Sequence, residues 1–85
     1  MPEISRFFGI VIQMYFDEHA PPHFHARYGR YRAKFGIHTG EVLGEFPPRA
    51  IRLVREWARQ HEGELLANWT TAQAGGNALP IEPLE

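Results

Sequence analysis

The 85-residue sequence contains no cysteine. It can therefore form no disulfide, use no thiolate nucleophile and build no cysteine-ligated zinc site. No apolar run is long enough to span a bilayer, and residues 1–6 lack the basic and apolar regions of a secretory signal peptide. We therefore expect a soluble cytoplasmic protein with no membrane partner. A chain of this length forms one small core with little stability to spare, so a homodimer or a complex with another protein is compatible with it.

Net charge is also nearly absent, but the charges are unevenly distributed. The formal net charge is −1, yet eight of the nine Lys and Arg residues lie between Arg27 and Arg59. That segment contains only three glutamates, and the residues after Gln60 contain four glutamates and no Lys or Arg. A basic middle and an acidic end indicate an anionic ligand or an acidic protein partner. The alternative is a solvated surface on which the charges are scattered by chance.

Alternating apolar residues predict a small antiparallel sheet. The stretch from Phe7 to Phe16 is apolar at both alternate sets of positions, which predicts one long strand covered on both faces. The predicted strands cover residues 7–16, 23–28, 31–37 and 41–46. Acidic residues and two prolines make a turn of residues 17–22. Gly29-Arg30 is typical of a two-residue type II′ hairpin turn, which has glycine first.

The C-terminal half has helical periodicity. Pro47-Pro48 suits the start of a helix, and Trp57 and Trp69 lie in phase on one apolar face. Gly63 interrupts this pattern, so we predict either two helices, about 48–60 and 62–74, or one kinked helix. The expected fold class is α+β: an antiparallel meander of three to four strands, with the helices packed on one sheet face. We expect a single domain over residues 1–76 and an extended or flexible tail over residues 77–85.

The sheet face left open by the helices is predicted to carry histidine and basic side chains. Period-2 alternation places His23, His25 and Arg27 on the face opposite to Phe24. Continuing the hairpin adds outward-facing side chains on the next strand. The complete predicted set is His23, His25, Arg27, Arg32 and Lys34.

Hairpin register predicts that like charges meet on this face. A two-residue loop places Arg27 opposite Arg32 and His25 opposite Lys34, and such pairs destabilise a ladder. We expect Glu41 and Glu45 to face His38 and Lys34 and to relieve only part of this repulsion. Arg27, Arg32 and Lys34 therefore predict an anion-binding surface, with RNA phosphate as one ligand. The alternative is a solvated face whose long side chains splay apart.

The histidines allow two kinds of chemistry. His23 or His25 can act as general acid or base in a metal-independent, RNase-like cleavage, with Lys or Arg stabilising the developing charge. Alternatively, His23 and His25 bind a divalent metal such as zinc. The preceding turn then supplies the third ligand, which is His19 or else Asp17. The positive charges of nearby Arg27 and Lys34 would repel such a cation. Outside that alternative we expect no cofactor, and the sequence leaves open whether the protein is an enzyme.

Other candidate residues have structural interpretations. His38 is expected in a turn or on the surface, and His61 as a hydrogen-bonded core or boundary residue. The two tryptophans are expected in the core. The helix arginines are expected on a solvated face: Arg49, Arg52, Arg55 and Arg59.

Two stretches of the chain resemble the small bacterial proteins of the domain-of-unknown-function 4160 family. They are ISRFFGIVIQMYFDEHAPPHFHARYGRYRAKFGIHTGEVL and FPPRAIRLVREWARQHEGELLANW, and the likeness extends to about Trp69. Its most specific parts are Pro21-Pro22-His23-Phe24-His25, Tyr28-Gly29, Thr39-Gly40-Glu41, Glu56-Trp57 and Asn68-Trp69. Gly63 departs from the family pattern, where a better helix former is usual.

The family has no established activity, so the resemblance implies a shared fold unit rather than a particular function. Family members are often encoded beside another small protein. This association implies a toxin–antitoxin-like pair, and therefore a second small protein as partner. The leading hypothesis is a binding module of such a two-protein system, whose basic sheet face takes an anionic partner.

Overall fold

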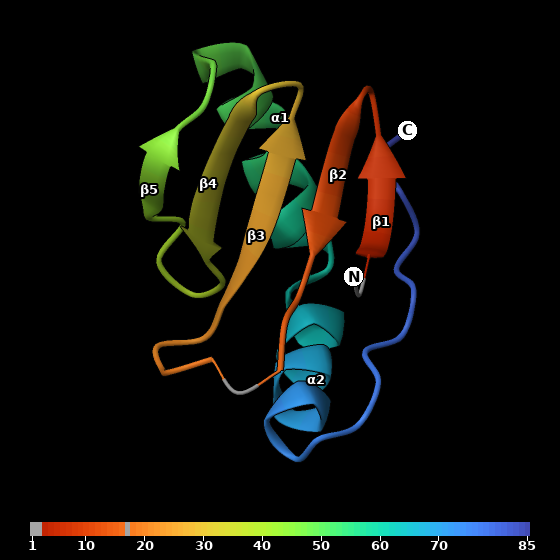
Figure 1. The fold of residues 1–85 in the computed structure, drawn as a ribbon. Coiled ribbons are helices and arrows are strands. Elements are labelled where there is room, and N and C mark those ends of the chain that lie inside the picture. Colours follow the sequence, from red (N-terminus) through yellow and green to blue (C-terminus); the bar gives the residue numbers. More distant parts are fainter. Residues whose placement is uncertain (1–2, 17) are drawn as a thin grey trace.

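The computed structural model describes residues 3–16 and 18–85. Five strands are followed by two helices. The elements are β1 (Glu3–Phe7), β2 (Ile10–Gln13), β3 (His23–Tyr28), β4 (Tyr31–Gly36), β5 (Val42–Glu45), α1 (Pro48–Gln60) and α2 (Glu62–Gln73). The strands form one antiparallel sheet in chain order, as Figure 1 shows. The α+β class is confirmed, with five strands in place of the three to four expected.

The strand expected over residues 7–16 is reduced to β2, and the extra strand, β1, lies almost entirely before it in the sequence. The chain reverses direction between these two strands at Phe8-Gly9. Both residues have positive φ, 49° and 81°, which is the backbone that a two-residue type I′ turn requires at both central positions. The turn pairs β1 with β2 and aligns Phe7 with Ile10. Hydrophobic patterning missed it because the stretch is apolar throughout and Phe8 is an unusual residue for a left-handed backbone.

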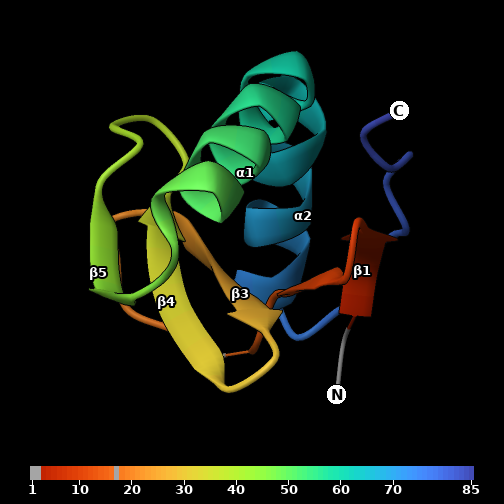
Figure 2. The same cartoon turned by 90° about the horizontal axis from the view of Figure 1, so that it is seen from above.

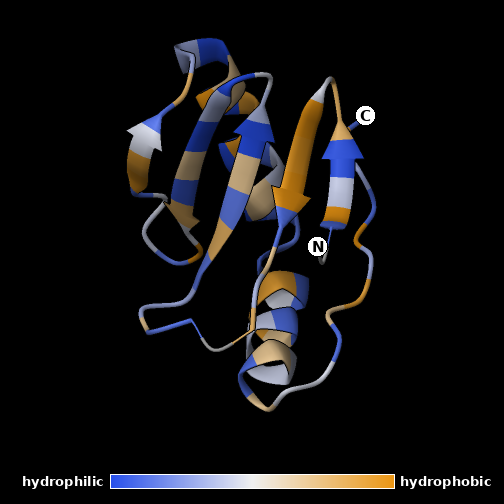
Figure 3. Ribbon diagram, viewed as in Figure 1, coloured by the Kyte–Doolittle hydropathy of each residue, from blue (hydrophilic) through white to orange (hydrophobic). Residues whose placement is uncertain are grey.

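Both helices cover one face of the sheet, which Figure 2 shows from above. The core between the layers contains Phe24 and Phe35, whose rings stack at 5.5 Å between centroids, with Trp57 of α1 edge-on to Phe24. All three side chains are buried, as the alternation of β3 and β4 predicts. The same alternation leaves the polar residues on the other face. In Figure 3, hydrophilic and hydrophobic colours alternate along β3 and β4.

The helical segment is two helices, which settles the choice left open by the sequence. The break falls at His61 (φ −124°, ψ 26°), which ends α1 and precedes α2. Gly63 lies in the first turn of α2, where a residue with poor helix propensity costs less than it does in mid-helix. Within the described residues, neither helix is long and apolar enough to cross a membrane.

The residues after α2 run back along the domain and contact it at several points. The amide of Ile81 donates to the carbonyl of Ile4 in the edge strand β1 (2.7 Å). Asn68 forms hydrogen bonds with both the carbonyl and the amide of Leu79 (2.8 and 2.9 Å). Ile81 and Leu84 are buried. The tail therefore covers part of the core beside β1, along the path seen in Figure 1.

Candidate functional site

The outer face of the sheet, away from the helices, carries cations directly opposite one another. The register pairs Arg27 with Arg32 and His25 with Lys34, as the hairpin at Gly29-Arg30 predicted. Arg32 and Lys34 are exposed and Arg27 is half-buried. We call Arg27, Arg32 and Lys34 the cationic row.

The carboxylates near the cationic row are not those expected from the sequence. Register with β5 places Glu45 opposite Arg32, and the apolar Leu43 opposite Lys34. Glu41 precedes β5, so the expectation that Glu41 and Glu45 face His38 and Lys34 is wrong. The expected register requires a two-residue turn at Thr39-Gly40, but β4 ends at Gly36, whose amide donates to the carbonyl of Glu41 across a longer turn.

Among residues 3–16 and 18–85, no carboxylate oxygen lies within 4.0 Å of a side-chain nitrogen of Arg27, Arg32 or Lys34, so none of the three cations forms an ion pair there. Glu3, at the sheet edge, is paired with Arg6 instead (2.8 Å). The hydrogen bond from Arg6 lowers the pKa of Glu3, and the charge of Arg27 lowers it further. A hollow of about 240 Å³ lies between Arg27, Arg32 and Tyr15 on this face. Positive charge therefore surrounds an accessible depression.

His23 does not lie on the open face, and this part of the sequence prediction is wrong. The residue is buried, with 9% of its surface exposed, and its ring packs against Trp69 of α2 at 5.1 Å between centroids. Because α2 extends past the end of the sheet, it covers the first residue of β3. The alternation of a strand predicts two faces, but it does not predict what covers the strand's end.

His23, His25 and Glu18 converge at this covered end of the sheet, and we call them the histidine cluster. One potential ligand atom from each residue lies within 4.8 Å of the other two. Oε1 of Glu18 is 2.5 Å from Nε2 of His25 and 3.5 Å from Nε2 of His23. Glu18 and His25 are both partly buried. A carboxylate and two imidazoles at this spacing can share a proton or hold a metal ion.

Neighbouring groups fix the orientation of each member of the cluster. Nδ1 of His23 lies 2.9 Å from the carbonyl of Pro21, and because a carbonyl only accepts, Nδ1 must donate. When His23 is neutral, its Nε2 therefore has a free lone pair, and this atom is buried without a hydrogen-bond partner in the described part of the chain. The side chain of Gln73 in α2 donates to the carbonyl of Glu18 at 2.5 Å. The Tyr15 ring lies edge-on to His25.

Two opposing effects act on the pKa of Glu18. Burial raises the pKa, whereas the hydrogen bond from His25 and the charges of His25 and His23 lower it. The lowering effects dominate, so the pKa of Glu18 lies below its ordinary value. The carboxylate form is consequently favoured at neutral pH, as a cation-binding or proton-accepting role requires.

The sequence prediction of the third metal ligand needs correction. His19 is exposed and does not belong to the group that converges with His23 and His25. Asp17, the other expected candidate, lies outside the described residues. Glu18, which lies between them in the sequence, supplies the third donor atom.

The model of the DUF4160 family, described as a domain of unknown function, matches residues 9–70. The chain belongs to this family. The match covers both the histidine cluster and the cationic row of this DUF4160 domain. No curated protein and no solved structure matches the chain.

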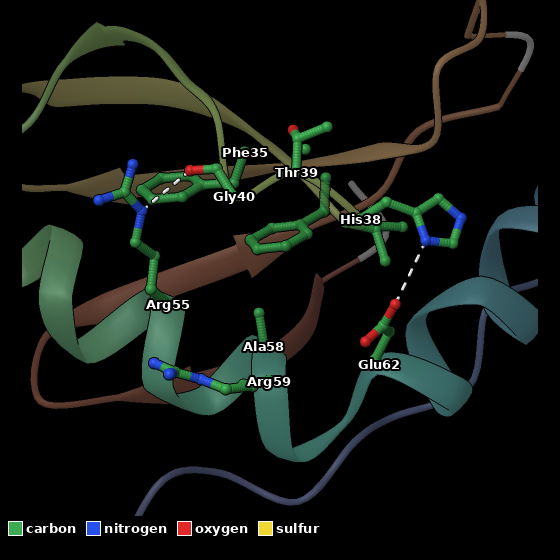
Figure 4. Close-up of a pocket in the computed structure, with 11 residues that line it drawn as sticks. Phe35, His38, Thr39, Gly40, Arg55, Ala58, Arg59 and Glu62 are labelled. Atoms are coloured by element: carbon green, nitrogen blue, oxygen red, sulfur yellow. Dashed lines mark hydrogen bonds and ion pairs between the residues drawn. The ribbon is translucent and has the colours of Figure 1, made fainter.

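A second hollow of the DUF4160 domain lies between the turn after β4 and the helices, and Figure 4 shows it. Nδ1 of His38 is 3.2 Å from Oε2 of Glu62, and both side chains are exposed. Arg55 donates to the carbonyl of Gly40 (2.9 Å). His38 is therefore a surface residue, as expected, and one arginine of the helix stripe holds a loop. Arg59 also borders this hollow. Among the described residues, no buried side-chain atom that lacks a hydrogen-bond partner faces this hollow, whereas Nε2 of His23 in the histidine cluster is such an atom.

The last histidine, His61, lies between the two helices. Its Nδ1 is 2.6 Å from Oε1 of Glu64, and its ring packs on Trp57. The expected boundary position is confirmed. Trp57 and Trp69 are both buried, which confirms their expected place in the core.

Sequence reasoning missed Glu18. Glu18 was placed among the acidic residues of the turn over residues 17–22, and a turn containing two prolines has no periodicity from which to predict side-chain direction. The available signal was proximity alone: an acidic residue seven positions before His25 at the mouth of a turn leading into β3.

Proposed function

We propose that this protein is a binding module whose cationic row engages an anionic partner, and that this partner is RNA. The observation that carries the proposal is the register of β3 and β4, which holds Arg27 directly opposite Arg32 without an ion pair for either among the described residues. Like charges across a ladder are destabilising. A bound phosphate would remove that repulsion, so the free energy lost in the apo protein is recovered on binding.

RNA fits the surroundings of the cationic row. Same-face residues along a strand are about 7 Å apart and neighbouring strands about 5 Å apart, so the three cations form a compact patch rather than a line. Tyr15 borders the hollow between Arg27 and Arg32. Basic groups that contact phosphates next to an aromatic side chain are typical of surfaces that bind single-stranded nucleic acid.

A two-protein, toxin–antitoxin-like system is part of this proposal. In that setting the RNA-binding module would be the toxin, and a second small protein would cover its basic face. Complementarity then requires the second protein to present acidic side chains, as RNA presents phosphates. Competition between that protein and RNA for the wild-type module would support the arrangement.

Cleavage of the bound RNA is a further hypothesis, in which a histidine transfers the proton. Burial of Nε2 of His23 favours His25, which borders the same hollow as Arg27 and Arg32. In this hypothesis His25→Ala abolishes cleavage and leaves the thermal melt nearly unchanged. A His25→Ala variant with full activity would remove it.

Fluorescence anisotropy of a labelled single-stranded RNA tests the binding proposal, with EDTA present and salt varied. We expect micromolar binding that weakens steeply with salt. The double variant Arg32→Ala/Lys34→Ala should lose binding at physiological salt. In low salt, where residual binding can be measured, the magnitude of the slope of log K against log salt should fall by about 0.7 for each phosphate contact removed.

A matched control removes the same charge elsewhere. Arg49→Ala/Arg52→Ala takes two exposed arginines from α1 and should leave binding nearly unchanged. Absence of binding at low salt would exclude RNA. Binding of polyglutamate in preference to RNA would instead indicate an acidic protein as the partner.

A further inference from the structure

We infer that the histidine cluster is a binding site for a first-row divalent transition metal, with Glu18, His23 and His25 as its protein ligands. The inference does not depend on the proposed RNA binding, because it uses none of the residues of the cationic row. It replaces the ligand set expected from the sequence, in which His19 took the place of Glu18. Two imidazole nitrogens and one carboxylate oxygen form a donor set that suits zinc, nickel, cobalt, manganese and ferrous ions.

The decisive observation is the free lone pair of His23. Nε2 of this side chain is buried, lies 3.5 Å from Oε1 of Glu18 and has no hydrogen-bond partner among residues 3–16 and 18–85. When His23 is neutral, its Nε2 and Oε1 of Glu18 are two acceptor atoms that face each other without a proton between them, which is unfavourable, and a buried unpaired polar atom is costly. A cation placed between them satisfies both atoms.

The groups behind the ligands are those found behind metal ligands in general. A metal-bound histidine almost always donates its other ring N–H to a carbonyl or carboxylate, which fixes its orientation. Nδ1 of His23 donates to the carbonyl of Pro21 at 2.9 Å. The backbone of Glu18 is tied to α2 by Gln73, and the ring of His23 is held by Trp69. The site is therefore built by β3, the preceding turn and α2 together.

Distances within the cluster require only small side-chain movements. Bonds of about 2.0–2.2 Å in a tetrahedral arrangement place ligand atoms about 3.3–3.5 Å apart. The separation between Glu18 and His23 is already 3.5 Å. The separation between Glu18 and His25 is 2.5 Å and must widen, which rotation of the partly exposed Glu18 side chain permits. The metal displaces the proton shared by Glu18 and His25.

A path to solvent leads to this site. A hollow of about 250 Å³ reaches Glu18 and His23 and is bordered by Lys34 and Glu41. Three protein ligands leave one coordination position of a tetrahedral ion for water or another ligand, and this hollow is where that ligand would enter. Lys34 repels the cation but would attract an anion bound to it. The carboxylate of Glu18 offsets the repulsion at shorter range.

Zinc titration by isothermal calorimetry tests the inference, using the 85-residue protein without an affinity tag after treatment with a chelator. We expect one Zn²⁺ per chain. Glu18→Gln keeps the shape of the side chain but removes its charge and one oxygen ligand, and should weaken Zn²⁺ binding at least 100-fold. His25→Ala should do the same. Co²⁺ should give intense visible absorption bands, typical of four-coordinate cobalt, with the wild type and not with Glu18→Gln.

Two histidine variants serve as matched controls. His19→Ala removes the exposed histidine next to Glu18, and His38→Ala removes one that pairs with a carboxylate elsewhere. Both should bind Zn²⁺ as the wild type does. Circular dichroism of each variant without metal verifies that it is folded, so that His25→Ala and Glu18→Gln report on binding alone.

Three results would overturn the metal site. Absence of stoichiometric Zn²⁺ or Co²⁺ uptake by folded wild-type protein would refute it, and Glu18, His23 and His25 would then be a hydrogen-bonded cluster only. Unchanged affinity in Glu18→Gln would do the same. Loss of binding in His38→Ala would move the ion to the pair with Glu62. RNA binding measured in EDTA is unaffected by any of these results, so the two proposals fail separately.

Discussion

Two groups of ionisable side chains lie side by side on the sheet, and they differ in how their charges are satisfied. In the histidine cluster, one carboxylate contacts both imidazoles, and a helix and a turn hold the three side chains in place. In the cationic row, the charged groups oppose one another without an ion pair among the described residues. His25, opposite Lys34, is the point where the groups meet.

The difference separates stability from binding. A side chain held by several neighbours contributes to the folded state, and removing it leaves cavities and unpaired polar atoms. An exposed cation beside other cations contributes little to the stability of the fold or lowers it. Binding of an anionic ligand would relieve the repulsion between such cations. We therefore expect substitutions in the histidine cluster to change the free energy of unfolding, and substitutions in the cationic row to change affinity.

The largest effect is expected within the histidine cluster itself. His23→Ala removes a buried ring packed on Trp69 and a hydrogen bond to Pro21, and should lower the free energy of unfolding by about 2–3 kcal/mol. His25→Ala removes a partly exposed pair with Glu18 and should cost about 1 kcal/mol or less. Urea-induced unfolding in EDTA, followed by tryptophan fluorescence, measures both. Equal losses would mean that burial of His23 does not distinguish it from His25.

A smaller effect of opposite sign is expected in the cationic row. Lys34→Gln removes the charge that faces His25 and should raise the free energy of unfolding by about 0.2–1 kcal/mol at low salt, because a repulsion is lost. The gain should shrink as salt screens the remaining charges. Arg49→Gln, on the exposed side of α1, is the matched control and should change nothing measurable. A Lys34→Gln variant less stable than wild type would show that this side chain stabilises the sheet.

The smallest effect concerns Glu3, which reports the electrostatic field of the cationic row. The hydrogen bond from Arg6 and the charge of Arg27 hold the pKa of Glu3 below its usual 4.5. Its ionised form is thus favoured by the fold, and this contribution is present above pH 4.5 and is lost as the pH falls through the lowered value. In a carbon-detected NMR titration, Arg6→Ala should raise the pKa of Glu3 most and Arg27→Gln slightly. No change in Arg27→Gln would place Arg27 outside effective range.

Much of the sheet could be predicted because it depends on neighbouring residues. The glycine of Gly29-Arg30 has φ 58°, and the two-residue loop fixes the register of β3 against β4 and therefore the pairing of Arg27 with Arg32. The reversal at Phe8-Gly9 could not be predicted in the same way, because a bulky residue with positive φ is held there by the surrounding sheet rather than by its own preference.

In the candidate site, too, the residues positioned by local sequence were predicted and those positioned by distant contacts were not. Arg32 and Lys34 were correctly placed on the exposed face, since alternation along a central strand determines it. Glu18 and the burial of His23 were not foreseen. Both depend on α2, which contacts the turn and the start of β3 from residues far along the chain: the bond between Gln73 and Glu18 joins positions 55 apart.

The sequence by itself therefore determined the local features: strand alternation, the register of β3 against β4 and the helix start at Pro48. These follow from backbone preferences and from repeats of two or 3.6 residues, which act over a few positions. Only the tertiary structure decided which carboxylate meets the histidines, which end of the sheet is covered and where the tail lies. Those outcomes depend on how two layers fit together, and side-chain burial at the edge of a layer is fixed by the partner layer rather than by the strand.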